Sequence, residues 1–252
     1  MPFFVKLLNK TKVLLFREQK DIFKISLYLM FILVLTKVSG FLFSAIVASK
    51  LGAGKELDMF ILSNTIPEII GNLILIGVVS AVFIPVLVKA KTKGGDASFL
   101  RLFNNLLNLS VVAFVIFAII VSLTAGLFLP VLLEKIMHQD QMYTAQEVSE
   151  MVAMLRLLFV PQIVLGISTF YSSGLNVYDR FLIPQLAPFI FNIGRVLCAF
   201  FLIPRIGGGN ALVLGTILGA ILHLAIQIPS AKIVGIKHKL IFNLRKFWKR
   251  CS

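Results

Sequence analysis

The sequence predicts an all-α, polytopic membrane protein with about six transmembrane helices, and three observations lead to this prediction. Apolar residues make up 58% of the 252 residues, charged residues only 14%, and the mean hydropathy is +0.96. A soluble domain is about half apolar and about a quarter charged. The apolar residues also form runs near the roughly 20 residues that a helix needs to cross a bilayer. Helices are expected because an open sheet would leave backbone groups unpaired in lipid.

The predicted spans divide the chain into three parts. Residues 1–24 form a basic arm that lacks the apolar core and cleavage site of a signal peptide. Residues 25–230 form the six-helix transmembrane lobe, and residues 231–252 form a basic tail. The spans are Ile25–Ser49, Met59–Val88, Leu106–Leu129, Met151–Val177, Ile183–Ile203 and Ala211–Ser230.

The basic residues predict the orientation. They gather in the arm, after the second and fourth spans and in the tail, whereas the opposite loops hold only Lys50, Lys55, Lys135 and Arg205. This bias predicts that both termini are cytoplasmic. The net charge of +14 therefore points to anionic membrane lipids as partners and not to nucleic acid. The tail either lies on the inner leaflet as an amphipathic segment or only sets the topology.

Ionisable residues inside the spans are the candidate functional residues. Lys37, Glu68 and Arg195 lie at membrane depth, where a charged side chain usually faces a partner or a water-filled cavity. Lys37 and Glu68 lie at similar depths, so a contact between them is possible. They would either line a path for a charged cargo or form a structural ion pair. Arg156 lies near a span end and is expected to extend toward the interface.

The second span contains prolines and glycines that allow a helix to bend, among them Pro67 and Gly71. Bent helices often line transporter cavities, although small residues also serve close packing. No motif for a metal, a cofactor or a catalytic group is visible, so we expect neither a cofactor nor an enzyme. Cys198 and Cys251 do not suggest a disulfide framework, and His223 is expected to be a hydrogen-bonded interior histidine.

Several spaced motifs resemble the lipid II flippase family (MurJ/MviN), part of the multidrug/oligosaccharidyl-lipid/polysaccharide exporter superfamily. They are "KVSGF" from Lys37, "LGAGKELDMF" from Leu51, "IPEII" from Ile66, "GVVSAVFIPVL" from Gly77, "LNVYDRFLIPQLAPFIFN" from Leu175 and "LHLAIQIPSAKIVG" from Leu222. The resemblance covers about residues 22–235. It implies one six-helix lobe of a MurJ/MATE-like transporter in the inner (plasma) membrane. Such a transporter works by alternating access and uses a cationic cavity to hold a lipid-linked anionic glycan precursor.

The resemblance also suggests roles for single residues. Lys37 stands where the family has a cavity arginine and would hold the anionic head group of the cargo. Asp58 matches an acidic residue at the outer mouth, and with Pro67 and Gly71 it is expected to take part in gating. Phe43 and Gly71 stand where the family has further arginines, and Ile76 stands where it often has a glutamate.

The resemblance implies a second lobe that this sequence does not contain. We expect either a fragment of a longer flippase or a half-size protein that pairs with a second lobe or forms a homodimer. The function expected is that of a lipid II flippase or its N-terminal half. The alternatives are an exporter of another polyprenyl-linked glycan or a non-transporting, truncated membrane protein.

Overall fold

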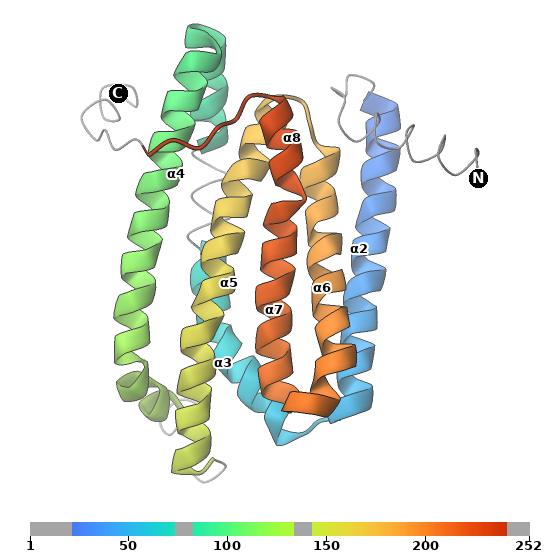
Figure 1. The fold of residues 1–252 in the computed structure, drawn as a ribbon, viewed down its shortest axis with the longest axis vertical. Helices are drawn as coiled ribbons and strands as arrows, with labels where there is room; N and C mark the ends of the chain where they lie inside the picture. Colours follow the sequence, from blue (N-terminus) through green and yellow to red (C-terminus); the bar gives the residue numbers. More distant parts are fainter. Residues whose placement is uncertain (1–21, 74–82, 134–142, 241–252) are drawn as a thin grey trace.

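The computed structural model describes residues 22–73, 83–133 and 143–240, and every regular element in these ranges is a helix. The elements are α2 (Ile22–Leu51), α3 (Lys55–Gly71), α4 (Ile84–Val131), α5 (Ala145–Val177), α6 (Leu182–Ile206), α7 (Gly208–Ala225) and α8 (Gln227–Ile233). They run side by side in alternating directions (Figure 1). The start of α2, the end of α5 and helix α8 lie at one end, which we call the basic end. The all-α prediction is confirmed.

Among the described residues, five helices are long and apolar enough to cross a membrane: α2, α4, α5, α6, and α7 continued by α8. The ends of the predicted span Met59–Val88 lie in α3 and α4, and because its middle lies outside the described residues, the span as a whole stays a prediction. Residues 74–82, which include Ile76, lie outside the described residues. So do most of the basic arm (1–21) and the distal tail (241–252), and the predicted limits of the arm, the lobe and the tail stay predictions.

A glycine divides the long helix α4 into two arms. Gly95 has φ 63° and ψ −169°, between Ile84–Gly94 and Asp96–Val131. This positive φ is readily adopted only by glycine. Leu87 of the first arm and Phe99 of the second are fully buried in one core cluster that also contains Phe103 and Phe170. The break at Gly95 therefore folds the two arms into a helical hairpin that packs on α5.

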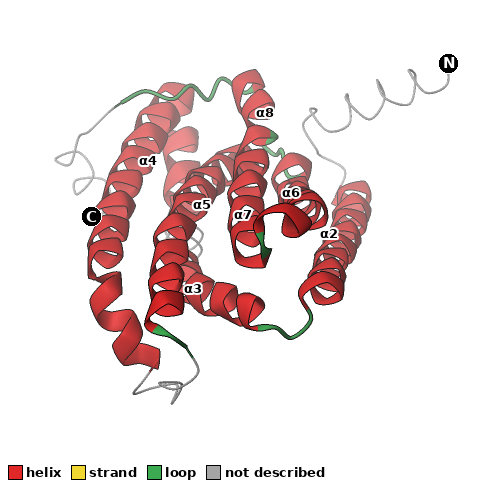
Figure 2. Cartoon of the chain, turned by 60° about the horizontal axis from the view of Figure 1, so that its bottom comes forward, coloured by secondary structure: helices red, strands yellow, loops and turns green. Residues whose placement is uncertain are grey.

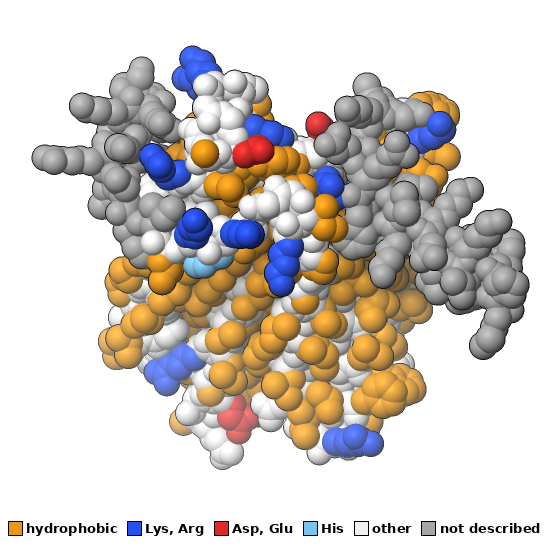
Figure 3. Space-filling view, turned by 45° about the horizontal axis from the view of Figure 1, so that its top comes forward, with side chains coloured by type: hydrophobic (Ala, Val, Ile, Leu, Met, Phe, Trp, Pro, Cys, Tyr) orange, Lys and Arg blue, Asp and Glu red, His pale blue; other side chains and the backbone are white. Residues whose placement is uncertain are grey.

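The apolar surface of the bundle fits a membrane and not water. Large side chains are exposed along the helices, and Phe41, Leu123 and Leu127 expose 73%, 74% and 75% of their surface. Figure 3 shows hydrophobic side chains over much of the helix surface, with Lys and Arg gathered at the basic end. Such a continuous apolar surface is far larger than a soluble monomer tolerates and suits the apolar interior of a membrane.

Helices α6 and α7 pack closely because glycines face each other between them. A Cβ atom on Gly194 would lie 2.9 Å from the Cα atom of Gly219, and one on Gly219 would lie 2.7 Å from the backbone oxygen of Phe191. Small residues at helix interfaces let backbones approach closely in membranes. This pair therefore fixes the position of α6, which carries Arg195, relative to α7.

We expect Gly219→Ala to destabilise the lobe by about 1–3 kcal/mol, because the added methyl group meets backbone that cannot move aside. The measurement is thermal unfolding of the purified protein in detergent. Gly126→Ala is the matched control, since a Cβ atom there meets nothing within 4 Å. Equal midpoints for the two variants would show that α6 and α7 can separate without cost.

After α8 the chain crosses over to α4 as an extended strap, Gly235–Leu240 (Figure 1). Two buried asparagines of α4 hold its backbone. Asn104 Nδ2 donates to the oxygen of Lys237 at 3.0 Å, and Asn104 Oδ1 accepts from the nitrogen of Lys239 at 2.7 Å. Asn108 Nδ2 donates to the oxygen of Lys239 at 2.9 Å, and Asn108 Oδ1 lies 2.8 Å from His238 Nε2. The backbone of the strap is thus hydrogen-bonded by side-chain amides, whereas the backbone of a β-strand is hydrogen-bonded by a neighbouring strand.

Candidate functional site

Arg195 of α6 lies against the ring of Phe43 from α2. The guanidinium carbon is 3.7 Å from the centroid of Phe43 and 5.4 Å from that of Phe191. A guanidinium over an aromatic face is stabilised by about 0.5–2 kcal/mol, more where water is scarce. The Nε atom of Arg195 is buried and has no hydrogen-bond partner. The ring contact therefore holds this cation without fully satisfying it.

Glu68 of α3 lies near enough to Arg195 for an electrostatic interaction but forms no salt bridge with it among the described residues. Its side chain is exposed, and Glu68 Oε2 accepts a hydrogen bond of 2.7 Å from Asn64 Nδ2. The carboxylate is thus held on its own helix, and Arg195 keeps part of its capacity for an anion.

Lys37 lies on α2 beside the hydrogen bonds that join this helix to α6. Asn192 Nδ2 donates to the oxygen of Thr36 and to Ser39 Oγ, both at 3.1 Å. The side chain of Lys37 itself is exposed. Across the described ranges it forms no ion pair, with Glu68 or with any other acid.

The Lys37–Glu68 contact that equal depth allowed is therefore not formed. Helix α2 packs mainly against α6, whereas α3 packs mainly against α5. Neighbours in sequence are not packed neighbours here, so similar depth does not bring the two side chains together.

Pro67 and Gly71 lie in the buried face of α3 that packs on α5. Pro67 removes one backbone donor from the helix. A Cβ atom on Gly71 would collide with the side-chain amide of Gln162 on α5. This close approach occurs at the last residue of α3, where the described helix ends.

Asp58 lies in the first turn of α3, at the end of the bundle opposite the basic end (Figure 2). Its charge acts on Tyr143: burial, and next the negative charge of Asp58, raise the pKa of Tyr143. The adjacent Lys55 Nζ forms a 2.8 Å salt bridge with Glu147 Oε2 at the start of α5. The first turn of α3 is therefore tied to α5 by charge.

A second tie at this end involves Glu56 and the start of α7. Glu56 Oε2 accepts a 2.6 Å hydrogen bond from the backbone nitrogen of Gly208, the first residue of α7. A carboxylate at a helix N-terminus is stabilised by the unpaired N–H groups there. Separating α3 from both α5 and α7 would break this contact and the Lys55–Glu147 bridge.

A buried polar network joins α5 to α7 and α8. Ser168 Oγ lies 2.7 Å from His223 Nδ1 and accepts a 2.6 Å hydrogen bond from Gln227 Nε2, while Ser172 Oγ donates to Gln227 Oε1 at 2.9 Å. The expectation that His223 is a hydrogen-bonded interior histidine is confirmed. Sequence analysis did not single out Ser168 or Gln227, although their polar character in apolar runs was the available signal.

Arg156 also forms a link between helices. Its Nε atom donates a 2.9 Å hydrogen bond to the backbone oxygen of Ser122 on α4. The side chain is exposed, and it bonds to a neighbouring helix in place of a partner in a cavity. Arg195, by contrast, has no such partner for its Nε.

The family model of the lipid II flippase MurJ matches residues 47–250, and these include α3 to α8, with Arg195, Glu68 and Asp58. This chain belongs to the lipid II flippase MurJ family. Its membership and its five spans confirm a multi-pass protein of the inner membrane, and a family of transporters is consistent with a protein that is not an enzyme.

Curated MurJ relatives match over most of this chain. The lipid II flippase MurJ of Burkholderia cenocepacia is 24% identical over 200 residues, which cover 79% of this chain and 38% of the relative. The probable lipid II flippase MurJ of Haemophilus influenzae is 26% identical over 207 residues, which cover 81% of this chain and 40% of the relative. The chain thus spans about two fifths of the length of these relatives.

Two of the contacts described above lie at positions that the resemblance to the MurJ family singles out. The resemblance implies family arginines at the positions of Phe43 and Gly71, and both residues are buried here. Phe43 carries the guanidinium of Arg195 on its ring, while a side chain at Gly71 would require the amide of Gln162 to move. No cluster of three or more His, Cys, Asp or Glu side chains suited to a metal occurs among the described residues.

Proposed function

We propose that this chain forms one six-helix lobe of a flippase that moves a lipid-linked anionic glycan precursor, lipid II in the first instance, across the membrane. The observation that carries the proposal is a pair of cations at membrane depth in a MurJ family member. Within the described residues, Lys37 is exposed without an ion pair, and Arg195 has a buried Nε without a hydrogen bond. A cargo with a pyrophosphate would supply the missing anion. The chain would act as a transporter and not as a catalyst.

Both termini are cytoplasmic in this proposal. The basic end carries most of the Lys and Arg residues near the ends of the described helices, for example Lys89, Lys93, Lys232 and Lys237, whereas Lys50, Lys55 and Arg205 lie at the other end. Positive charge marks the cytoplasmic side of membrane proteins. The end at which α3 begins then faces outward.

Alternating access requires a wall opposite this lobe. Since the chain spans about two fifths of its MurJ relatives, we propose that a second lobe completes the cavity. That lobe would come from further polypeptide, from another protein or from a second copy of this chain.

Helix α3 is the proposed gate on the outward side. Asp58 lies in its first turn, Pro67 weakens its backbone hydrogen bonding, and Gly71 allows its last turn to move along Gln162 of α5. Opening would separate α3 from α5 and α7, so it would break the contacts of Lys55 and Glu56.

A second candidate is export of another polyprenyl-linked glycan. It is favoured by Gly71, which replaces the arginine that the resemblance implies for the family and packs closely against the side-chain amide of Gln162. Fewer cavity cations would suit a cargo with less charge than a pyrophosphate-linked precursor.

Complementation tests the proposal. In cells depleted of their own flippase, we expect this chain, joined to the second lobe of a relative, to restore growth, and Lys37→Ala to abolish the rescue without loss of membrane insertion. Lys37→Arg should retain activity because it keeps the cation. Lys50→Ala is the control on the same helix; this residue lies over the Phe200 ring, 5.1 Å from its centroid, at the outward end.

Two outcomes would count against the proposal. Undiminished rescue by Lys37→Ala would remove Lys37 from the cargo path. The second candidate would be favoured if a well-inserted wild-type fusion does not rescue flippase-depleted cells but rescues cells that lack the exporter of another polyprenyl-linked glycan. Labelling of Lys37→Cys by a water-soluble thiol reagent, in a variant without Cys198 and Cys251, would further test whether position 37 is wet.

A further inference from the structure

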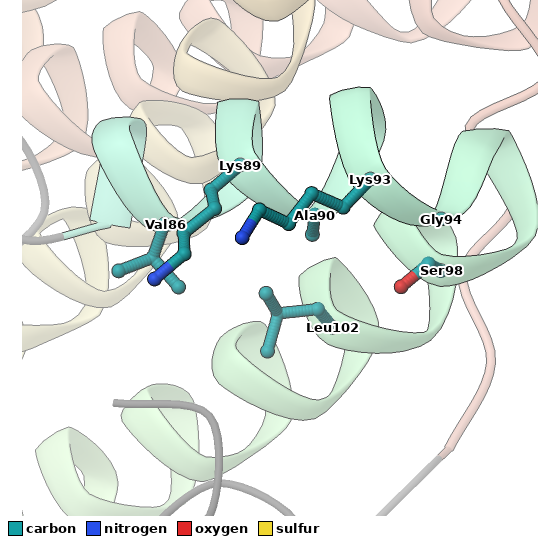
Figure 4. Close-up of a pocket in the computed structure, with 7 residues that line it drawn as sticks. All are labelled: Val86, Lys89, Ala90, Lys93, Gly94, Ser98 and Leu102. Carbon is teal, nitrogen blue, oxygen red and sulfur yellow. The ribbon is translucent and has the colours of Figure 1, made fainter. Parts of the chain in front are cut away.

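A groove of about 330 Å³ lies between the two arms of α4 at the basic end (Figure 4). Lys89 and Lys93 of the first arm line one wall, and Leu102 of the second arm lies opposite. Val86 and Ala90 add apolar surface. The groove thus combines two cations with an apolar floor, at the end of a membrane-spanning helix.

The two lysines converge without an acid. They are four residues apart on one helix face, and Figure 4 shows both side chains reaching over the same groove. Like charges with this spacing destabilise a helix by about 0.2–0.5 kcal/mol. Among the described residues, neither lysine has an ion pair or a side-chain hydrogen bond. An anion between them would turn this repulsion into attraction.

The acid nearest in sequence is engaged elsewhere. Asp96 Oδ1 accepts a 2.8 Å hydrogen bond from the hydroxyl of Tyr178, at the end of α5. The third lysine of this arm, Lys91, also turns to α5: its Nζ donates to the oxygen of Val177 at 2.9 Å and lies 3.5 Å from the centroid of the Tyr178 ring. Lys91 and Asp96 therefore close the hairpin onto α5, while Lys89 and Lys93 are left for a ligand.

We propose that this groove binds the phosphodiester head group of an anionic phospholipid of the inner leaflet, at a site separate from the proposed cargo path. The phosphate lies between the ammonium groups of Lys89 and Lys93, and the first methylenes of the lipid cover Val86, Ala90 and Leu102. Basic pockets between helices on the cytoplasmic side suit such head groups. The apolar floor favours a lipid over a free phosphate ion, which has no apolar part to cover it.

The test titrates the purified full chain in neutral detergent with phosphatidylglycerol, phosphatidylcholine or soluble glycerol 3-phosphate and counts bound molecules by native mass spectrometry. We expect the first phosphatidylglycerol to bind about thirtyfold more weakly to the Lys89→Gln/Lys93→Gln variant. The Lys89→Arg/Lys93→Arg variant should bind as the wild type does. Lys232→Gln/Lys237→Gln is the charge-matched control from the same end, and it should leave the affinity within about twofold.

Three results would overturn the proposal. One is unchanged phosphatidylglycerol binding in the Lys89→Gln/Lys93→Gln variant. Another is an equal loss in the Lys232→Gln/Lys237→Gln control, which would show that only total charge matters. The third is displacement of the lipid by glycerol 3-phosphate at comparable concentration, which would show a site for a free phosphate. Because the side chains of all four substituted lysines are exposed, every variant is expected to unfold at the same midpoint as the wild type.

Discussion

Replacing Arg195 with methionine is expected to stabilise the folded lobe and yet to abolish transport of a lipid-linked precursor. An arginine at the centre of a membrane helix costs about 2.5–3.5 kcal/mol on insertion scales. The contact with the Phe43 ring offsets about 0.5–2 kcal/mol of this cost. The buried Nε forms no hydrogen bond that would offset the rest. Methionine keeps much of the volume without the charge, so a net gain of roughly 1 kcal/mol remains. Transport should fail because the protein loses a cation that would bind the anionic head group of the cargo.

The two effects are measured separately. Thermal unfolding in detergent gives the stability, and rescue of flippase-depleted cells by the fusion described above gives transport. Arg205→Met, in the last turn of the same helix, is the control and should change neither quantity much, because Arg205 is exposed. A less stable Arg195→Met variant that still transports would mean that Arg195 is a structural residue and not part of the cargo path.

Arg195 also shows how far sequence reasoning reaches. Its place in the middle of an apolar run predicts a residue of functional interest. Its ring partner, Phe43, could not be predicted, because no periodicity says which helices are packed together. The same limit explains why the sequence suggested a contact between Lys37 and Glu68 that the structure does not contain. Depth follows from counting residues along a helix, but facing depends on α2 packing with α6 and α3 with α5.

Hydropathy predicts the helices well because membrane spans are long and uniformly apolar. Three of the six predicted runs correspond to one helix each, namely α2, α5 and α6. A fourth corresponds to the second arm of α4, and a fifth to α7 with α8. The second run has its ends in α3 and in the first arm of α4, and its middle lies outside the described residues.

Asparagines in an apolar run carried a signal that sequence analysis did not use. The stretch "LFNNLLNLS" in α4 contains Asn104, Asn105 and Asn108, and all three are buried. Amides in such a run need hydrogen-bond partners. The partners of Asn104 and Asn108 lie in the strap, far along the chain, so only the fold reveals that these residues hold the exit of the polypeptide from α8.

We therefore expect Asn104→Leu to release the strap and to lower the stability of the lobe by about 1–3 kcal/mol. The variant loses the hydrogen bonds of Asn104 with Lys237 and Lys239 and leaves their backbone groups without these partners. Leaving a buried polar group unpaired costs about 1–3 kcal/mol, although water can satisfy part of it at this end of the bundle. Hydrogen exchange of the peptide covering 235–240 should become faster, and the unfolding midpoint should fall.

A surface asparagine separates this effect from a general loss of amides. Asn210 is exposed near the start of α7, and among the described residues its side chain forms only a 3.5 Å hydrogen bond with the oxygen of Ile206, so Asn210→Leu should leave the strap protected. If exchange in the strap is as slow in Asn104→Leu as in the wild type, its position depends on Ile236, which is buried in the core cluster of α4 and α5. In that case the asparagine side chains of α4 bond to a strap that is already in place, and apolar packing sets the path of the chain beyond α8.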